Sequence, residues 1–243
     1  MSELARYSRQ IVLRELGVNG QQLLRDSTVL LIGLGGLGSI AAAYLAGAGI
    51  GRLLLSDRDR VDTSNLQRQV LYRQSDVGRL KSEAAAAQLR ALNAGIEIEA
   101  LDAQAGLAAV AQADVVLDCT DNFPARRAIN AACVRARKPL VSGAAIRFEG
   151  QLALFDVAAG SACYDCLYPD TGEQAETCEE AGILGPVVGT VGALQALLAL
   201  KYLLGLREDL NALQVWDARQ MQWRRFTMSI DPACAVCGQT RLT

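Results

Sequence analysis

Two pairs of cysteines and one run of glycines are the residues of this chain whose types and spacing indicate chemistry. The cysteines form two Cys-X-X-Cys pairs, Cys163 with Cys166 and Cys234 with Cys237. Four thiolates complete the tetrahedral coordination of a zinc ion and leave no position for a reacting water, so they predict one structural zinc site. The glycine run, residues 33–38 (GLGGLG), follows an apolar segment, and such a turn before a helix binds nucleotide phosphates.

Charged residues beyond the glycine run favour ATP over NAD as the nucleotide. Asp57 ends an apolar segment and is placed to accept hydrogen bonds from a ribose diol, which both nucleotides carry. Arg68 and Lys81 follow, and a triphosphate about to lose pyrophosphate needs such cations, whereas hydride transfer does not. Asp121, after another apolar segment, offers a hard oxygen ligand for Mg²⁺. We therefore expect Mg-ATP, with an NAD-dependent oxidoreductase as the alternative.

Composition narrows the class of protein further. The chain has 243 residues, 51% of them hydrophobic, enough for one large α/β domain. A net charge of -2 with scattered basic residues predicts neither a nucleic-acid partner nor a membrane surface. The seven cysteines and the polar first ten residues predict a cytoplasmic protein without disulfides. The chain contains no histidine, which excludes Ser-His and Cys-His catalysis.

The elements that must position these residues alternate between strands and helices. Strand patterns occupy residues 28–34, 52–57, 96–101, 114–119 and 139–142. Helix patterns occupy residues 40–49, 80–93 and 124–137. Because ligand-type residues follow the strands, this order predicts an α/β fold with a Rossmann-like, doubly wound, mostly parallel sheet and a crevice at one edge. Short strands at residues 151–155, 213–217 and 222–228 predict an antiparallel C-terminal extension that carries the zinc clip.

One apolar segment, residues 187–204, is long enough to raise the question of a membrane span. It contains Gln195 and Lys201, begins after Gly185 and Pro186, and has no second span beside it. We therefore expect a helix of the core or of a subunit interface.

Several strings together resemble the ubiquitin-activating-enzyme-like adenylyltransferases of the MoeB and ThiF type. They are residues 6–10, 33–38, 64–69, 118–122, 163–166, 185–189 and 234–237. The resemblance implies that the chain uses Mg-ATP to adenylate the C-terminal glycine of a small ubiquitin-fold sulfur carrier that ends in Gly-Gly. It also implies a homodimer. Because no rhodanese-like segment follows the second cysteine pair, we expect a separate sulfur donor, a cysteine desulfurase or a rhodanese.

The resemblance assigns roles to matching residues. Arg9, Arg68, Lys81 and Asp121 are expected to be catalytic, with Arg9 reaching into the neighbouring subunit and Asp121 at the magnesium. The implied nucleotide-binding residues are Gly36, Asp57, Ser64, Asn65, Leu66, Gln67, Arg68, Lys81, Asp121 and Asn122. The implied organisation is a single adenylating domain, residues 1–243: a helical arm (1–27), a nucleotide-binding core (28–150) and a carrier-binding extension with the zinc site (151–243).

Two features leave alternatives open. Residues 163–170 and 182–189 look closer to the thiamine branch of the family and residues 141–150 to the molybdopterin branch, so the carrier is of the ThiS or the MoaD type. In the thiamine branch a cysteine at the place of Cys178 becomes linked to the carrier, but three nearby glutamates should raise its pKa and oppose thiolate formation. A catalytically silent, zinc-clipped scaffold is the remaining alternative.

Overall fold

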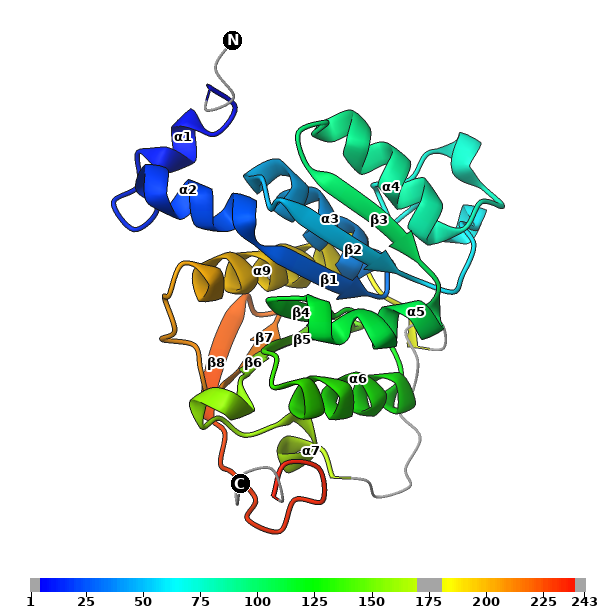
Figure 1. Ribbon diagram of the computed structural model, residues 1–243. Coiled ribbons are helices and arrows are strands. Elements are labelled where there is room, and N and C mark those ends of the chain that lie inside the picture. The colour runs from blue at the N-terminus through cyan, green and yellow to red at the C-terminus, as the bar shows by residue number, and fades with distance from the viewer. Residues whose placement is uncertain (1–4, 170–180, 239–243) are drawn as a thin grey trace.

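A single sheet of eight strands runs through the computed structural model, which describes residues 5–169 and 181–238 (Figure 1). The strand order is β3-β2-β1-β4-β5-β6-β7-β8. The first five strands in this order are parallel, and β6, β7 and β8 continue the sheet antiparallel. Their bounds are β1 (Thr28–Ile32), β2 (Arg52–Ser56), β3 (Glu97–Leu101), β4 (Val115–Asp118), β5 (Leu140–Ile146), β6 (Glu149–Phe155), β7 (Ala212–Asp217) and β8 (Gln222–Thr227).

Helices cover both faces of the sheet. They are α1 (Ser8–Ile11), α2 (Gly17–Asp26), α3 (Gly36–Ala48), α4 (Lys81–Leu92), α5 (Ala103–Ala108), α6 (Phe123–Ala136), α7 (Tyr164–Leu167) and α9 (Gly185–Leu203). Side chains of β1 alternate between two cores, as the pleat of a strand requires. Val29 and Leu31 pack with α3, α4 and α9, whereas Leu30 and Ile32 pack with α6. The predicted doubly wound arrangement is therefore confirmed.

Helix α9 is a core helix of this fold. By length and composition it is the single helix among the described residues that could cross a membrane, and 44% of its apolar window is buried. It packs against α3 so closely that a side chain at Gly192 would meet the carbonyl oxygen of Leu37 at 2.4 Å. Its N-terminal turn buries Val187 and Val188 against the same core. The apolar character of α9 thus serves helix-on-helix packing.

Three of the differences between the observed and the predicted elements concern α3, α5 and β6. Helix α3 begins four residues earlier than predicted, at Gly36, because the glycine turn itself forms the first helical turn. Helix α5 was not predicted, since its short alanine-rich sequence carries little periodicity. Strand β6 begins at Glu149, so the predicted boundary between residues 150 and 151 falls inside a strand that joins the parallel and antiparallel parts.

Candidate active site

A cavity of about 450 Å³ extends along the carboxyl ends of the central strands. Loops that follow β1, β2 and β4 form one end of it, and β6 and α7 form the other. The sequence-predicted residues that line it are Gly36, Asp57, Asn65, Arg68, Lys81, Asp121 and Asn122. Ser64, Leu66, Gln67 and Arg9 are not among the described residues of this wall. The predicted constellation is therefore mostly brought together in one place.

The glycine turn is shaped by close contacts with its own protein. Gly33 has φ +91°, a left-handed value, and a side chain there would meet the carbonyl oxygen of Cys119 at 2.7 Å. A side chain at Gly38 would meet the carbonyl oxygen of Gly33 at 1.9 Å, and one at Gly36 would meet Val188 at 2.6 Å. Glycine is thus required here for packing of the turn against β4 and α9 as well as for ligand approach.

Asp57 joins the glycine turn to the end of β2. Its Oδ2 accepts a hydrogen bond from the amide of Leu34 at 2.6 Å, and its Oδ1 accepts one from the amide of Asp59 at 2.8 Å. Burial raises the pKa of Asp57, and the nearby ammonium of Lys81 only partly opposes this effect. The carboxylate therefore holds the turn in shape while it faces the cavity.

Cations lie on the same side of the cavity. Lys81 begins α4, and its Nζ lies 3.2 Å from Oδ2 of Asp59, with only 8% of the lysine side chain exposed. Arg68 is partly exposed, and its Nη1 donates to the carbonyl oxygen of Ser64 at 3.1 Å. The small number of local contacts leaves the Arg68 guanidinium able to turn toward a bound anion.

Ser64 and Asn65 serve the loop itself. The Asp62 carboxylate accepts hydrogen bonds from the Ser64 hydroxyl at 2.6 Å and the Ser64 amide at 2.8 Å, and these two bonds lower the pKa of Asp62. Asn65 completes a capping box, because its Oδ1 accepts from the Asp62 amide at 3.2 Å. The backbone of Gln67 packs closely against Gly185, because a side chain at Gly185 would meet the carbonyl oxygen of Gln67 at 2.8 Å.

Two aspartates follow β4 in different settings. Asp118 is fully buried, and its carboxylate accepts from the Thr120 amide and hydroxyl and from the Ser142 hydroxyl. Asp121 is exposed at the cavity wall, where its Oδ1 accepts from Nδ2 of Asn122 at 3.3 Å. Asn122 also caps α6 through its Oδ1. Asp118 therefore fixes the loop, and Asp121 presents a carboxylate to a ligand.

Arg126 and Gln69 are among the polar residues of the wall to which the sequence prediction gave no role. Arg126 of α6 donates through Nη2 to the carbonyl oxygen of Thr120 at 2.7 Å. Burial disfavours its charged form, but the Asp118 carboxylate, Tyr164 and Tyr168 together outweigh this effect and raise the pKa of Arg126. Gln69 is buried, and its Oε1 has no hydrogen-bond partner within the described part of the chain. The position of Arg126 one turn after the helix cap Asn122 was the available sequence signal.

Arg9 lies apart from this cavity. It is exposed on α1, which Figure 1 shows at the opposite end of the molecule from α7. Cys178 lies outside the described residues, whereas Cys119 and Cys133 are buried, as expected for packed thiols. Burial raises the pKa of Cys133 to about 12, so this thiol stays protonated near neutral pH.

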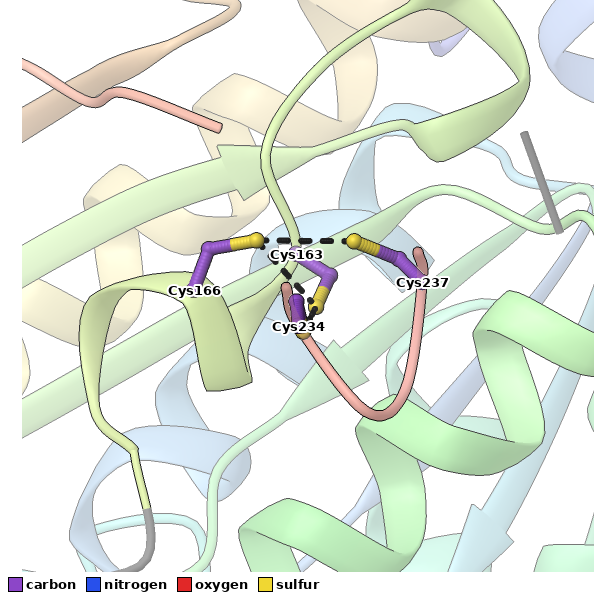
Figure 2. A group of neighbouring side chains, drawn as sticks. All are labelled: Cys163, Cys166, Cys234 and Cys237. Atoms are coloured by element: carbon purple, nitrogen blue, oxygen red, sulfur yellow. Dashed lines mark hydrogen bonds between the residues drawn. The ribbon is translucent and has the colours of Figure 1, made fainter. Parts of the chain in front are cut away.

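The four predicted cysteines converge between α7 and the C-terminal segment (Figure 2). Their sulfur atoms all lie within 4.8 Å of one another. Cys163 Sγ lies 3.8 Å from Cys166 Sγ and 3.7 Å from Cys234 Sγ, and Cys166 Sγ lies 3.4 Å from Cys237 Sγ. Zinc–sulfur bonds of about 2.3 Å in a tetrahedron separate the sulfurs by about 3.8 Å. The donor set and its spacing therefore fit zinc, and the distances are too long for disulfides.

Comparison with known proteins agrees with this geometry. The ThiF family model matches residues 7–236. The sulfur carrier protein ThiS adenylyltransferase of Escherichia coli is 48% identical over 97% of this chain and 96% of its own length. The molybdopterin-synthase adenylyltransferase of the same organism is 47% identical over 98% of this chain and 97% of its own length. A crystal structure of E. coli MccB with ATP is 27% identical, with a TM-score of 0.82 over 96% of this chain and 73% of that one. The chain belongs to the ThiF family.

Proposed function

We propose that this chain uses Mg-ATP to adenylate the C-terminal glycine of a small ubiquitin-fold sulfur carrier. The observation that carries the proposal is the cavity in which the glycine turn, Lys81, Arg68 and Asp121 meet. Full-length relatives named as ThiS and molybdopterin-synthase adenylyltransferases support the reaction class. The MccB structure with ATP supports the nucleotide. An oxidoreductase or an inactive scaffold would have no use for these cations.

In the proposed reaction, a carboxylate oxygen of the carrier's last glycine attacks the α-phosphorus of ATP. A new bond forms between that oxygen and the α-phosphorus, and the bond from the α-phosphorus to the bridging oxygen of the β-phosphate breaks. The products are a carrier acyl-adenylate and pyrophosphate. No proton has to be removed, because a C-terminal carboxylate is already ionised near neutral pH. This explains how a chain without histidine can catalyse the step.

The charged residues at the nucleotide end would stabilise the transition state. Lys81 and Arg68 would neutralise charge that develops on the phosphates, which is the main requirement of phosphoryl-type transfer. Gln69 lines the cavity, and its buried Oε1, which has no hydrogen-bond partner among the described residues, would accept a hydrogen bond from the nucleotide. Asp57 would accept one from the ribose.

Asp121 would hold the magnesium. It is an exposed carboxylate at the cavity wall, and carboxylate oxygen is the donor that Mg²⁺ prefers. When bound, the metal supplies charge neutralisation and alignment of the phosphates. The four-cysteine centre would hold zinc with no open coordination position, so we assign it no part in bond making.

A homodimer would complete the site with Arg9 of the neighbouring subunit. Helix α2 and the segment that joins it to α1 expose large apolar side chains that a second copy could cover: Val12 (80%), Leu13 (57%), Val18 (57%) and Leu23 (55%). Arg9 lies on the same arm and does not reach the wall of its own cavity within the described residues. A symmetric pair would therefore exchange arms and place each Arg9 near the other subunit's cavity.

We define the proposed carrier by the chemistry that the ThiS and MoaD types share, a flexible tail that ends in glycine. The ThiS and molybdopterin branches match this chain at 48% and 47% identity, so carriers of both types belong in the test. The acyl-adenylate is a mixed anhydride that a persulfide sulfur can attack to give a thiocarboxylate and AMP. We propose that a separate cysteine desulfurase or rhodanese supplies that sulfur.

Exchange of labelled pyrophosphate into ATP tests the proposal. We expect exchange with Mg-ATP only when a ThiS-type or MoaD-type carrier is present, and none with a carrier that lacks its last glycine. Carrier-independent exchange, or tight binding of NAD with no binding of ATP, would refute the assignment.

A further inference from the structure

Side chains of the N-terminal arm bind the ends of two other helices. The last carbonyl groups of a helix have no partner within that helix. Ala48 ends α3, and its carbonyl oxygen accepts a hydrogen bond from Nε2 of Gln10 at 2.8 Å. Leu92 ends α4, and its carbonyl oxygen accepts one from Nη1 of Arg6 at 3.1 Å. The arm therefore caps the C-termini of α3 and α4, and these contacts attach it to the rest of the chain.

Tyr7 occupies a slot above the end of α3. Gly49 has φ +83° there, and a side chain at this position would meet Cζ of the Tyr7 ring at 2.5 Å. The Tyr7 hydroxyl accepts from Nδ2 of Asn93 at 2.9 Å. Asn93 is 2% exposed, its Nδ2 also donates to the Ala46 carbonyl oxygen at 2.8 Å, and its Oδ1 accepts from the Gly95 amide at 3.1 Å. Asn93 is thus held from two sides and offers Tyr7 a fixed donor.

Gln10 meets a second buried amide. Gln21 of α2 is 4% exposed, and its Nε2 donates to the same Ala48 carbonyl oxygen at 3.1 Å. Its Oε1 accepts from Nε2 of Gln10. One amide donor of the arm therefore has two acceptors, both of which are fixed by the body of the protein.

Tyr7 and Gln10 flank Arg9 and turn it away from the protein. They are three residues apart, so they lie on one face of a helical turn, which the Gln10 and Ile11 amides close by donating to the Tyr7 carbonyl oxygen at 3.0 Å. Arg9 is exposed. Helix α1 has four residues, none of them buried, and so short a helix does not form by itself in water. The contacts of Tyr7 and Gln10 therefore determine where Arg9 points.

We propose that Tyr7, Gln10 and Asn93 are positioning residues, which hold the arm in the orientation that presents Arg9 to the cavity of the neighbouring subunit. This inference rests on the proposed adenylation and homodimer. A cation stabilises developing phosphate charge best when its place is fixed before the reaction, because no ordering is then needed in the transition state. An arm without its anchors would spread Arg9 over many positions. Loss of an anchor should therefore impair the partner's cavity and leave the variant's own cavity intact.

The test is a Gln10→Met substitution, which keeps the length of the side chain but removes the amide that bonds to Ala48 and Gln21. We expect carrier-dependent pyrophosphate exchange to fall at least about tenfold. Gln88→Met is the matched control, because it removes a similar part-buried amide that donates to Asp76, outside the described cavity wall. It should stay within about twofold of wild type. Tyr7→Phe keeps the ring and loses the hydroxyl, so it should give a smaller loss than Gln10→Met.

Two combinations separate positioning of Arg9 from a general structural role. Mixed with Asp121→Asn subunits, Gln10→Met should regain about a quarter of the wild-type activity, because its own intact cavity then receives a native arm. Added to Arg9→Ala, Gln10→Met should cause no further loss, since Gln10 acts through Arg9. Hydrogen–deuterium exchange of the free protein should show faster uptake at residues 7–13 in Gln10→Met and unchanged uptake in Gln88→Met.

The inference fails if Gln10→Met keeps wild-type exchange activity or wild-type deuterium uptake in the arm. It also fails if mixing gives no recovery after verified subunit exchange, or if the Arg9→Ala background shows a further loss, because a structural role within one chain would give those results. Absence of carrier-dependent exchange in the wild type would instead count against the proposed function. The deuterium comparison would then still decide whether Gln10 fixes the arm.

Discussion

The two ends of the cavity are built by different means. At the nucleotide end, loops after parallel strands present Asp57, Lys81 and Asp121, and hydrogen bonds within and between these loops hold them. At the other end, Tyr164 and Tyr168 depend on α6, β6 and a cysteine cluster that gathers residues far apart in the chain. The comparison indicates that loops at the ends of parallel strands present the charged groups, whereas the packing of α6, α7 and the cysteine cluster shapes the opposite end of the cavity.

Removal of the Asp121 carboxylate should give the largest effect. Asp121→Asn is expected to lower carrier-dependent exchange at least about 100-fold, because the magnesium on the phosphates loses its proposed protein ligand. Circular dichroism should show an intact fold, since Asp121 is exposed. Asp114→Asn removes the same charge just before β4, where an amide oxygen can still accept from the Thr28 amide, and should stay near wild type. Equal loss in both variants would contradict the assignment.

The Arg9→Ala variant alone should lose carrier-dependent exchange to a degree similar to Asp121→Asn, because its arm would no longer supply a cation to the cavity of the neighbouring subunit. Mixing it with Asp121→Asn subunits should restore activity, since a mixed dimer contains one site with both residues native. Equal mixing with random pairing predicts about a quarter of the wild-type activity. No recovery after verified subunit exchange would place the function of Arg9 within its own chain.

Loss of one cysteine of the zinc site should strongly lower the stability of the fold, although this site is remote from the nucleotide end of the cavity. Cys234→Ser is expected to reduce zinc below one per chain and to lower the unfolding midpoint by more than about 5 °C, because the tail loses its attachment to α7. Cys133→Ala, a buried thiol outside the cluster, should keep its zinc. Purified wild-type protein with clearly less than one zinc per chain would refute the site.

The smallest effect is expected from Cys178→Ser. Adenylation as proposed needs no thiol, so this variant should retain most carrier-dependent exchange. A loss of about 100-fold in a folded variant would show that the thiol takes part in adenylation. A carrier adduct present in wild type and absent from the variant, with exchange unchanged, would assign Cys178 to a later sulfur-transfer step.

The features that could be predicted from the sequence are those that a short run of residues encodes. The glycine turn, the two cysteine pairs and Asp121 were recognisable because each requirement, a tight turn, paired thiolates or a carboxylate after a strand, is met within a few residues. Arg126 was missed although its place one turn after the helix cap Asn122 was a local signal. Tyr168 was missed because its contact with Gln151 depends on the end of α7 meeting β6, which no local pattern encodes. Helix α5 was missed because its short alanine-rich sequence has no clear periodicity. The predicted boundary between residues 150 and 151 divided strand β6, because the change in sequence pattern there does not coincide with a break in the sheet.

Mass spectrometry of the carrier after incubation with this chain and Mg-ATP tests the central claim most directly. The account predicts a carrier whose mass has risen by one adenylyl group at its C-terminal glycine, together with an equal amount of pyrophosphate. A carrier that lacks the last glycine should show neither product. Formation of ADP and phosphate, or an unmodified carrier with both carrier types under conditions in which ATP binds, would contradict the account.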